Sequence, residues 1–142
     1  MNSIMIVDVA AFTRLMLRNI FESLGFEVIA EADNGKEAVR NYRLYRPSLV
    51  LIDIAVQDMD GLTASREILK YDQEAKIIIC SAITDRATVI GAVHMGVCDF
   101  IAKPLQKERV EWAIEHILGT EMRNEDGFQM LDRKKGWYAS LT

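Results

Sequence analysis

The sequence predicts an α/β domain of three layers, in which helices cover both faces of a doubly wound, five-stranded parallel sheet. Five short apolar runs recur along the chain, and several are apolar throughout, as expected of strands covered on both faces. Helical periodicity fills each gap between these runs. The connections are only a few residues long, which implies right-handed crossovers between parallel strands. The 142 residues are enough for one such domain.

The predicted elements alternate strictly between strand and helix. Strands are expected at 3–7, 26–30, 48–52, 76–80 and 98–101, and helices at 11–24, 36–45, 62–70, 86–95 and 106–118. Asn34 is placed to cap the second helix, and Arg46 before Pro47 to end it, because a residue that precedes proline avoids the helical region. Gly25 and Gly96 end the first and fourth helices.

The composition is typical of a globular protein, with 50% hydrophobic and 27% charged residues and a net charge of −4. Because there is no basic excess, we expect no direct binding to nucleic acid. The first residues contain neither a leader nor an anchor signal, so we expect no export and no membrane insertion. Cys80 and Cys98 lie in separate apolar segments, and we expect two reduced thiols rather than a disulfide, in the cytoplasm.

Polar side chains follow or end four of the predicted strands: Asp8, Asp53, Ser81 and Lys103. In a doubly wound sheet the carboxyl ends of the strands form the binding edge, so these side chains are expected to converge. A phosphoryl group that approaches a carboxylate to about 4 Å is repelled by about 4 kcal/mol at an effective dielectric constant of 20. Mg²⁺ and the lysine ammonium can offset that repulsion. The pattern therefore predicts a metal-dependent phosphoryl site.

Five motifs in this order resemble the response-regulator receiver family, most closely its stand-alone chemotaxis type. They are Ile6-Val7-Asp8-Val9-Ala10-Ala11-Phe12, Leu51-Ile52-Asp53-Ile54, Asp58-Met59-Asp60-Gly61, Cys80-Ser81-Ala82 and Asp99-Phe100-Ile101-Ala102-Lys103-Pro104. The resemblance covers residues 3–118. It implies a flavodoxin-like strand order of 2-1-3-4-5 and a cis peptide bond before Pro104.

The resemblance also implies the roles of the site residues. Asp53 would accept a phosphoryl group from a histidine kinase or a phosphotransfer protein. Asp8, Asp53 and the main-chain carbonyl of Ala55 would hold Mg²⁺, while Ser81 and Lys103 would bind the phosphoryl group. Such a domain assists only its own phosphoryl transfer, and we expect a signalling domain rather than an enzyme.

A switch and an output surface are implied as well. As the loop at Ser81 closes, the ring of Phe100 would turn inward, and the surface of the fourth helix, fifth strand and fifth helix would change its affinity for a downstream protein target. The residues assigned to this surface are Ile90, His94, Phe100 and Trp112. By helical spacing Trp112 falls opposite the apolar stripe of its helix, so we expect it to face outward near Arg109 and His116, in contact with a target or a second copy.

Val9 is the main departure from the family pattern, which normally has a second acidic ligand of the metal ion there. Because valine cannot ligate, we expect weak Mg²⁺ binding. Two interpretations stay open: a receiver that works with weak Mg²⁺, and a pseudo-receiver that is a phosphorylation-independent module for protein binding or dimerisation. A third, a flavin protein or hydrolase of flavodoxin-like fold, is disfavoured because Val9-Ala10-Ala11-Phe12 is no phosphate cradle.

Smaller departures surround the acceptor position. Gln57 replaces the usual proline, and Ala55 and Ile83 are apolar where the family often has polar side chains. Apolar neighbours hinder an attacking water molecule, so we expect a long-lived phosphorylated form.

Residues 119–142 lie outside the resemblance and form a C-terminal extension, whose aromatic content favours a helix docked on the domain over a frayed tail or a segment exchanged with a second chain.

Overall fold

A computed structural model describes residues 2–123 and shows five strands and five helices in strict alternation. The strands are β1 (Ser3–Val7), β2 (Glu27–Ala32), β3 (Leu49–Asp53), β4 (Ile77–Ser81) and β5 (Asp99–Ala102). The helices are α1 (Ala11–Ser23), α2 (Gly35–Tyr45), α3 (Gly61–Tyr71), α4 (Arg86–Met95) and α5 (Lys107–Arg123). All strand pairs are parallel and the order is β2-β1-β3-β4-β5, which confirms the predicted class and strand order.

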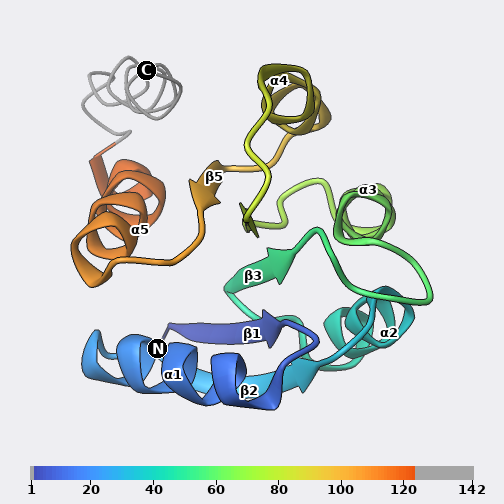
Figure 1. Cartoon of the computed structure of the whole chain (residues 1–142). Helices are drawn as coiled ribbons and strands as arrows, with labels where there is room; N and C mark the ends of the chain where they lie inside the picture. Colours follow the sequence, from blue (N-terminus) through green and yellow to red (C-terminus); the bar gives the residue numbers. More distant parts are fainter. Residues whose placement is uncertain (1, 124–142) are drawn as a thin grey trace.

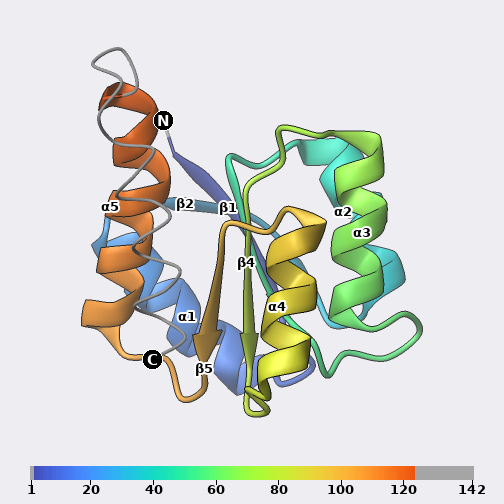
Figure 2. The same cartoon turned by 90° about the horizontal axis from the view of Figure 1, so that it is seen from above.

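The helices lie in two layers on opposite faces of the sheet. Figure 1 shows α1 and α5 on one face and α2, α3 and α4 on the other. Figure 2, seen from above, shows α1 and α5 side by side along one side of the sheet. Because every crossover returns the chain to the same edge, the carboxyl ends of all five strands meet at one rim.

The helix ends follow local backbone chemistry. The Asn34 side chain accepts a hydrogen bond from the Glu37 amide at 2.9 Å, and Arg46 ends α2 with a left-handed backbone (φ 46°). Gly96 ends α4 at φ 112°, a conformation that glycine adopts without strain. At the C-terminus, α5 continues to Arg123 rather than ending at 118. The rest of the predicted extension, residues 124–142, lies outside the described residues.

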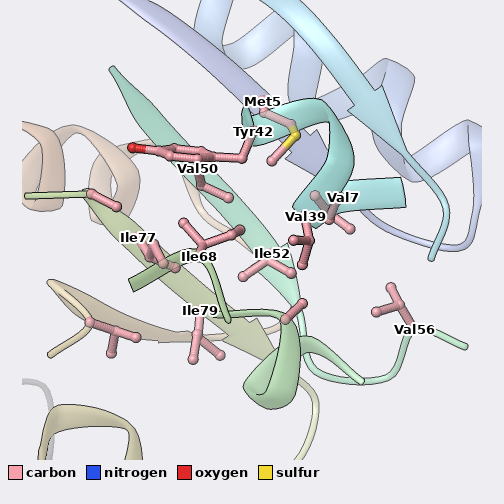
Figure 3. Close-up of a cluster of buried hydrophobic side chains, with 14 of the residues drawn as sticks. Met5, Val7, Val39, Tyr42, Val50, Ile52, Val56, Ile68, Ile77 and Ile79 are labelled. Carbon is pink, nitrogen blue, oxygen red and sulfur yellow. The ribbon is translucent and has the colours of Figure 1, made fainter. Parts of the chain in front are cut away.

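Each layer of helices closes its own hydrophobic core against the sheet. Figure 3 shows the core under α2, α3 and α4, where Val39, Tyr42 and Ile68 face side chains from the middle of the sheet. The second core lies under α1 and α5. Since both faces are covered, every residue of β3 and β4 is buried.

The two thiols belong to these buried strands and loops. Cys80 and Cys98 are both buried. Burial, helped by the charge of Asp53, raises the pKa of the Cys80 thiol to about 12. Within residues 2–123, the structure has no helix that is both long enough and apolar enough to span a bilayer.

Candidate functional site

Three charged side chains meet at the rim where the strands end. Asp8 follows β1, Asp53 ends β3 and Lys103 follows β5. The Lys103 ammonium donates to Asp8 Oδ2 at 2.7 Å and to Asp53 Oδ2 at 2.5 Å. Residues from three separate strands therefore form one cluster, at the edge where the sequence predicted it.

The cluster is held in place by main-chain hydrogen bonds and by burial. Asp8 is 1% exposed and Asp53 is 5% exposed. The remaining oxygen of each carboxylate accepts an amide hydrogen bond, from Ala10 at 2.9 Å and from Ala55 at 3.1 Å. Burial alone lowers the pKa of Lys103, but its hydrogen bonds to Asp53 and Asp8 outweigh burial and raise that pKa above its ordinary range. The lysine is thus held as a cation.

A cavity of about 390 Å³ opens in front of Asp53. Ser81 and Lys103 line it together with Asp53, so the hydroxyl predicted from the end of β4 shares the cavity with the carboxylate and the ammonium. The Ser81 hydroxyl oxygen accepts a hydrogen bond from the Ile83 amide at 3.0 Å. Ala55 and Ile83 are exposed and also line the cavity, which confirms their place beside Asp53.

The loop between β3 and α3 passes tightly under the carboxylate. A Cβ atom on Gly61 would lie 2.2 Å from the main-chain oxygen of Asp53, and the Gly61 amide donates to the Ile54 carbonyl at 2.9 Å. Only glycine permits this approach. Asp58 and Met59 have positive φ values of 57° and 137°, so the loop also has a strained backbone. This close packing fixes the position of Asp53 from behind.

Thr88 was missed in the sequence analysis, although it lines the same cavity from α4. Its amide and hydroxyl both donate to the Asp85 carboxylate, which caps the helix. The spacing of Asp85 and Thr88 is that of a helix cap and could have indicated that the N-terminus of α4 reaches the site.

The donor atoms at the rim fit Mg²⁺ through two carboxylates. Asp8 and Asp53 share Lys103 as a partner, and Mg²⁺ commonly binds through one or two carboxylates plus phosphate oxygens. Val9, which is 51% exposed, offers only an isopropyl group at the loop after Asp8. Within the described part of the chain there is no cluster of three or more acidic, histidine or cysteine side chains suited to a metal ion.

The predicted partner surface is exposed only in part. His94 is exposed and Ile90 is partly exposed on α4. Phe100, however, is 4% exposed and packs in the core with Val89 and Ala92, so in this structure its ring belongs to the interior and not to a partner surface. The predicted cis bond between Lys103 and Pro104 is present.

The structure shows the outward orientation predicted for Trp112 only in part. Its ring is half-buried and packs against the core under α1 and α5. The helical spacing was correct, but an indole is large enough to fold back along the helix surface and reach the core from its edge. The expected neighbours are confirmed: the ring stacks on His116 at 3.8 Å between centroids, and the Arg109 guanidinium lies 5.0 Å from its centre.

Comparison with known proteins gives a consistent result. The family model of the response regulator receiver domain matches residues 4–115. The chemotaxis protein CheY of Bacillus subtilis is 49% identical over 115 residues, covering 81% of this chain and 96% of that protein. CheY of Thermotoga maritima is 46% identical over 114 residues, covering 80% of this chain and 95% of its own.

A solved structure extends the similarity to three dimensions. The complex of CheX, CheY, BeF₃ and Mg²⁺ from Borrelia burgdorferi contains a chain that superposes with a TM-score of 0.80 at 33% identity, covering 82% of this chain and 89% of that one. Its fold and the strand order seen here agree. This chain therefore belongs to the response regulator receiver family of two-component signalling and is CheY-like.

Proposed function

We propose that the chain accepts a phosphoryl group on Asp53 from a histidine kinase or a phosphotransfer protein in the cytoplasm. The observation that supports this most strongly is the Lys103 ammonium, which is bonded to both Asp8 and Asp53 at the wall of the cavity. A cation in that place lies beside the nucleophilic oxygen and within reach of the oxygens of an incoming phosphoryl group. It offsets the repulsion between two anions.

In the transfer, a carboxylate oxygen of Asp53 attacks phosphorus, the P–N bond of the phosphohistidine breaks, and its electron pair stays on the imidazole. Lys103 Nζ then exchanges its bond to Asp53 for one to a phosphoryl oxygen, while Asp8 keeps it charged and in place. Mg²⁺ held by Asp8, Asp53 and the Ala55 carbonyl would neutralise further charge on the phosphoryl oxygens.

We further propose that the product signals to a downstream protein target through the surface of α4, β5 and α5. The Ser81 hydroxyl would donate to a phosphoryl oxygen and so leave the Ile83 amide, which now donates to it at 3.0 Å. A switch of this kind responds only as far as its two states differ in contacts with the phosphoryl group. Thr88 of α4 lines the cavity, and Ile90 and His94 follow it on the same helix.

The test is acetyl phosphate with Mg²⁺, followed by the intact mass of the full chain. We expect an added mass of about 80 Da, one phosphoryl group, in the wild type. Asp53→Asn should abolish the added mass. Asp58→Asn, an exposed acid of the same loop, is the matched control and should keep it. No adduct on the wild type would contradict the proposal and favour the phosphorylation-independent module.

We also propose that the phosphorylated form is long-lived. Ala55 and Ile83, the latter 71% exposed, present apolar side chains at the cavity mouth, where neither can orient or activate a water molecule. The adduct is expected to decay over minutes or longer after excess acetyl phosphate is removed. The decay is followed by the same mass measurement. A half-life of seconds would show that these side chains do not protect the phosphorylated Asp53 from water.

A further inference from the structure

A groove between α2 and α3 combines an apolar floor with a basic rim. It encloses about 470 Å³, and Val39, Leu44 and Met59 form its apolar part. Leu44 is 62% exposed, which is unusual for so large an apolar side chain beside a groove. Met59 reaches the groove from the strained loop behind Asp53. A partner that buries an apolar side chain here would cover this exposed surface.

The basic rim consists of Lys36, Arg40 and Arg43, all exposed on α2. At spacings of four and three residues they form one stripe along the helix. Within residues 2–123 none of the three forms an ion pair with a carboxylate, although Arg43 lies over the Tyr71 ring at 5.2 Å. Three cations without carboxylate partners, on a chain whose net charge is −4, favour an acidic partner.

An acidic stripe of matching spacing lies on α5. Glu108, Glu111 and Glu115 are exposed at spacings of three and four residues, and in the described part of the chain none has an ion-pair partner. Trp112, which is partly exposed, lies on the same helix face. Arg109 and His116 flank the ring, so the face offers three carboxylates beside a partly exposed aromatic ring, the counterpart of a basic rim beside an apolar floor.

The two stripes match when the helices run antiparallel. Lys36 then meets Glu115, Arg40 meets Glu111 and Arg43 meets Glu108, because the intervals of four and three residues coincide in reverse order. These intervals correspond to rises of about 6 Å and about 4.5 Å along each helix. In a parallel arrangement the intervals would not coincide.

We propose that a second copy of this chain docks the α5 face bearing Glu108, Glu111, Trp112 and Glu115 in the groove between α2 and α3. Because α2 and α5 lie on opposite faces of the sheet (Figure 1), the contact joins different surfaces of the two copies. A nucleic acid is the less favoured occupant, because the chain as a whole is acidic. The contact does not depend on phosphorylation.

The test is sedimentation equilibrium of the full chain without phosphodonor, at about 20 mM and about 500 mM salt, where the Debye length falls from roughly 20 Å to roughly 4 Å. We expect the weight-average mass to exceed the 16.1 kDa of one chain at low salt, with an association constant at least about tenfold smaller at high salt. A wild type that stays monomeric at low salt and about 0.5 mM protein overturns the proposal.

Charge reversal identifies the two faces. The α2 reversal is Lys36→Glu, Arg40→Glu and Arg43→Glu, and the α5 reversal is Glu108→Lys, Glu111→Lys and Glu115→Lys. Each alone should be monomeric, whereas an equimolar mixture should associate again, because each variant then offers a face complementary to the other. A mixture that stays monomeric, or a reversal that still self-associates, contradicts the assigned contact.

The matched control reverses three exposed cations away from the basic stripe, Arg66→Glu, Lys70→Glu and Arg86→Glu, with the same change in net charge. It should associate more strongly than the α2 reversal at equal ionic strength. Equal loss in both would show that net charge, and not the α2 stripe, governs association. Far-ultraviolet circular dichroism establishes that every variant is folded before it is compared.

Discussion

Replacing Val9 by aspartate measures how much the missing acid matters for metal binding. Val9 is 51% exposed and directly follows Asp8, so the exchange removes no core contact and adds a carboxylate beside the two acids. Loss of a residue that only supports a ligand lowers metal affinity about 10–100-fold, and a direct ligand contributes at least as much. We expect the Mg²⁺ dissociation constant of Val9→Asp to be at least about tenfold lower than that of the wild type.

The same exchange should change stability in opposite directions with and without the ion. Without Mg²⁺, the new charge is repelled by two carboxylates and attracted by one ammonium. At about 6 Å and in the dielectric constant of water each pair interacts by about 0.7 kcal/mol, so the net loss of stability is about 0.7 kcal/mol. With Mg²⁺ at 100 times its dissociation constant, binding adds about 2.7 kcal/mol to the free energy of unfolding. The free energy of unfolding of Val9→Asp should therefore lie below that of the wild type without Mg²⁺ and rise above it as Mg²⁺ is added.

The assay is urea unfolding followed by circular dichroism, in EDTA and at a series of Mg²⁺ concentrations. Val9→Asn is the matched control, since asparagine has the shape of aspartate without the charge. It should show a much smaller loss of stability in EDTA and a much smaller gain of stability with Mg²⁺. If wild type and Val9→Asp respond equally to Mg²⁺, residue 9 lies outside the metal shell and the reasoning from this position is wrong.

Three other changes test the site and the core. Lys103→Met leaves oxygens of Asp8 and Asp53 facing each other across roughly 5 Å, where two unit charges repel by about 3 kcal/mol at a dielectric constant of 20. We therefore expect a lower free energy of unfolding, measured with urea at neutral pH. A decrease below about 0.5 kcal/mol would contradict the inference that the ammonium offsets this repulsion. Gly61→Ala places a Cβ atom 2.2 Å from the main-chain oxygen of Asp53, so we expect the free energy of unfolding to fall by more than about 2 kcal/mol and less phosphorylated product to form. An unchanged free energy and an unchanged amount of product would show that the loop can move to accept the methyl group. Stability should fall above about pH 10, because Lys103 and Tyr42 both have raised pKa values in the folded state and the unfolded chain loses these protons first. Tyr42→Phe should fall less steeply in urea titrations across this range; an equal slope would count against a contribution from Tyr42.

Two of the departures from the family pattern, Ala55 and Ile83, line the cavity in front of Asp53, and a third, Val9, lies on the loop after Asp8. Asp8 and Asp53 are buried beside Lys103. The proposed acceptor Asp53 and its partner Lys103 are thus in contact, whereas the side chains at positions 9, 55 and 83 are apolar. Weak metal binding and slow loss of the phosphoryl group are the combined expectation.

Local chemistry allowed the elements to be predicted from the sequence. Apolar runs such as 48–52 and 76–80 are short, continuous and bounded by turns, and a strand buried on both faces requires that pattern. The cap at Asn34 and the left-handed ends at Arg46 and Gly96 depend on residues a few positions apart. The predicted end of the last helix at 118 was too early, because α5 continues through Gly119 to Arg123.

What the sequence by itself determined was the class of fold and the edge at which Asp8, Asp53, Ser81 and Lys103 would gather, since the ends of parallel strands share one rim. Only the tertiary structure decided that one ammonium bonds both carboxylates, across 95 and 50 residues of chain, and that the rings of Phe100 and Trp112 turn toward the core. Spacing along the chain defines a face, but contacts between faces depend on sheet register, crossover geometry and side-chain size, and these exist only once the layers have packed.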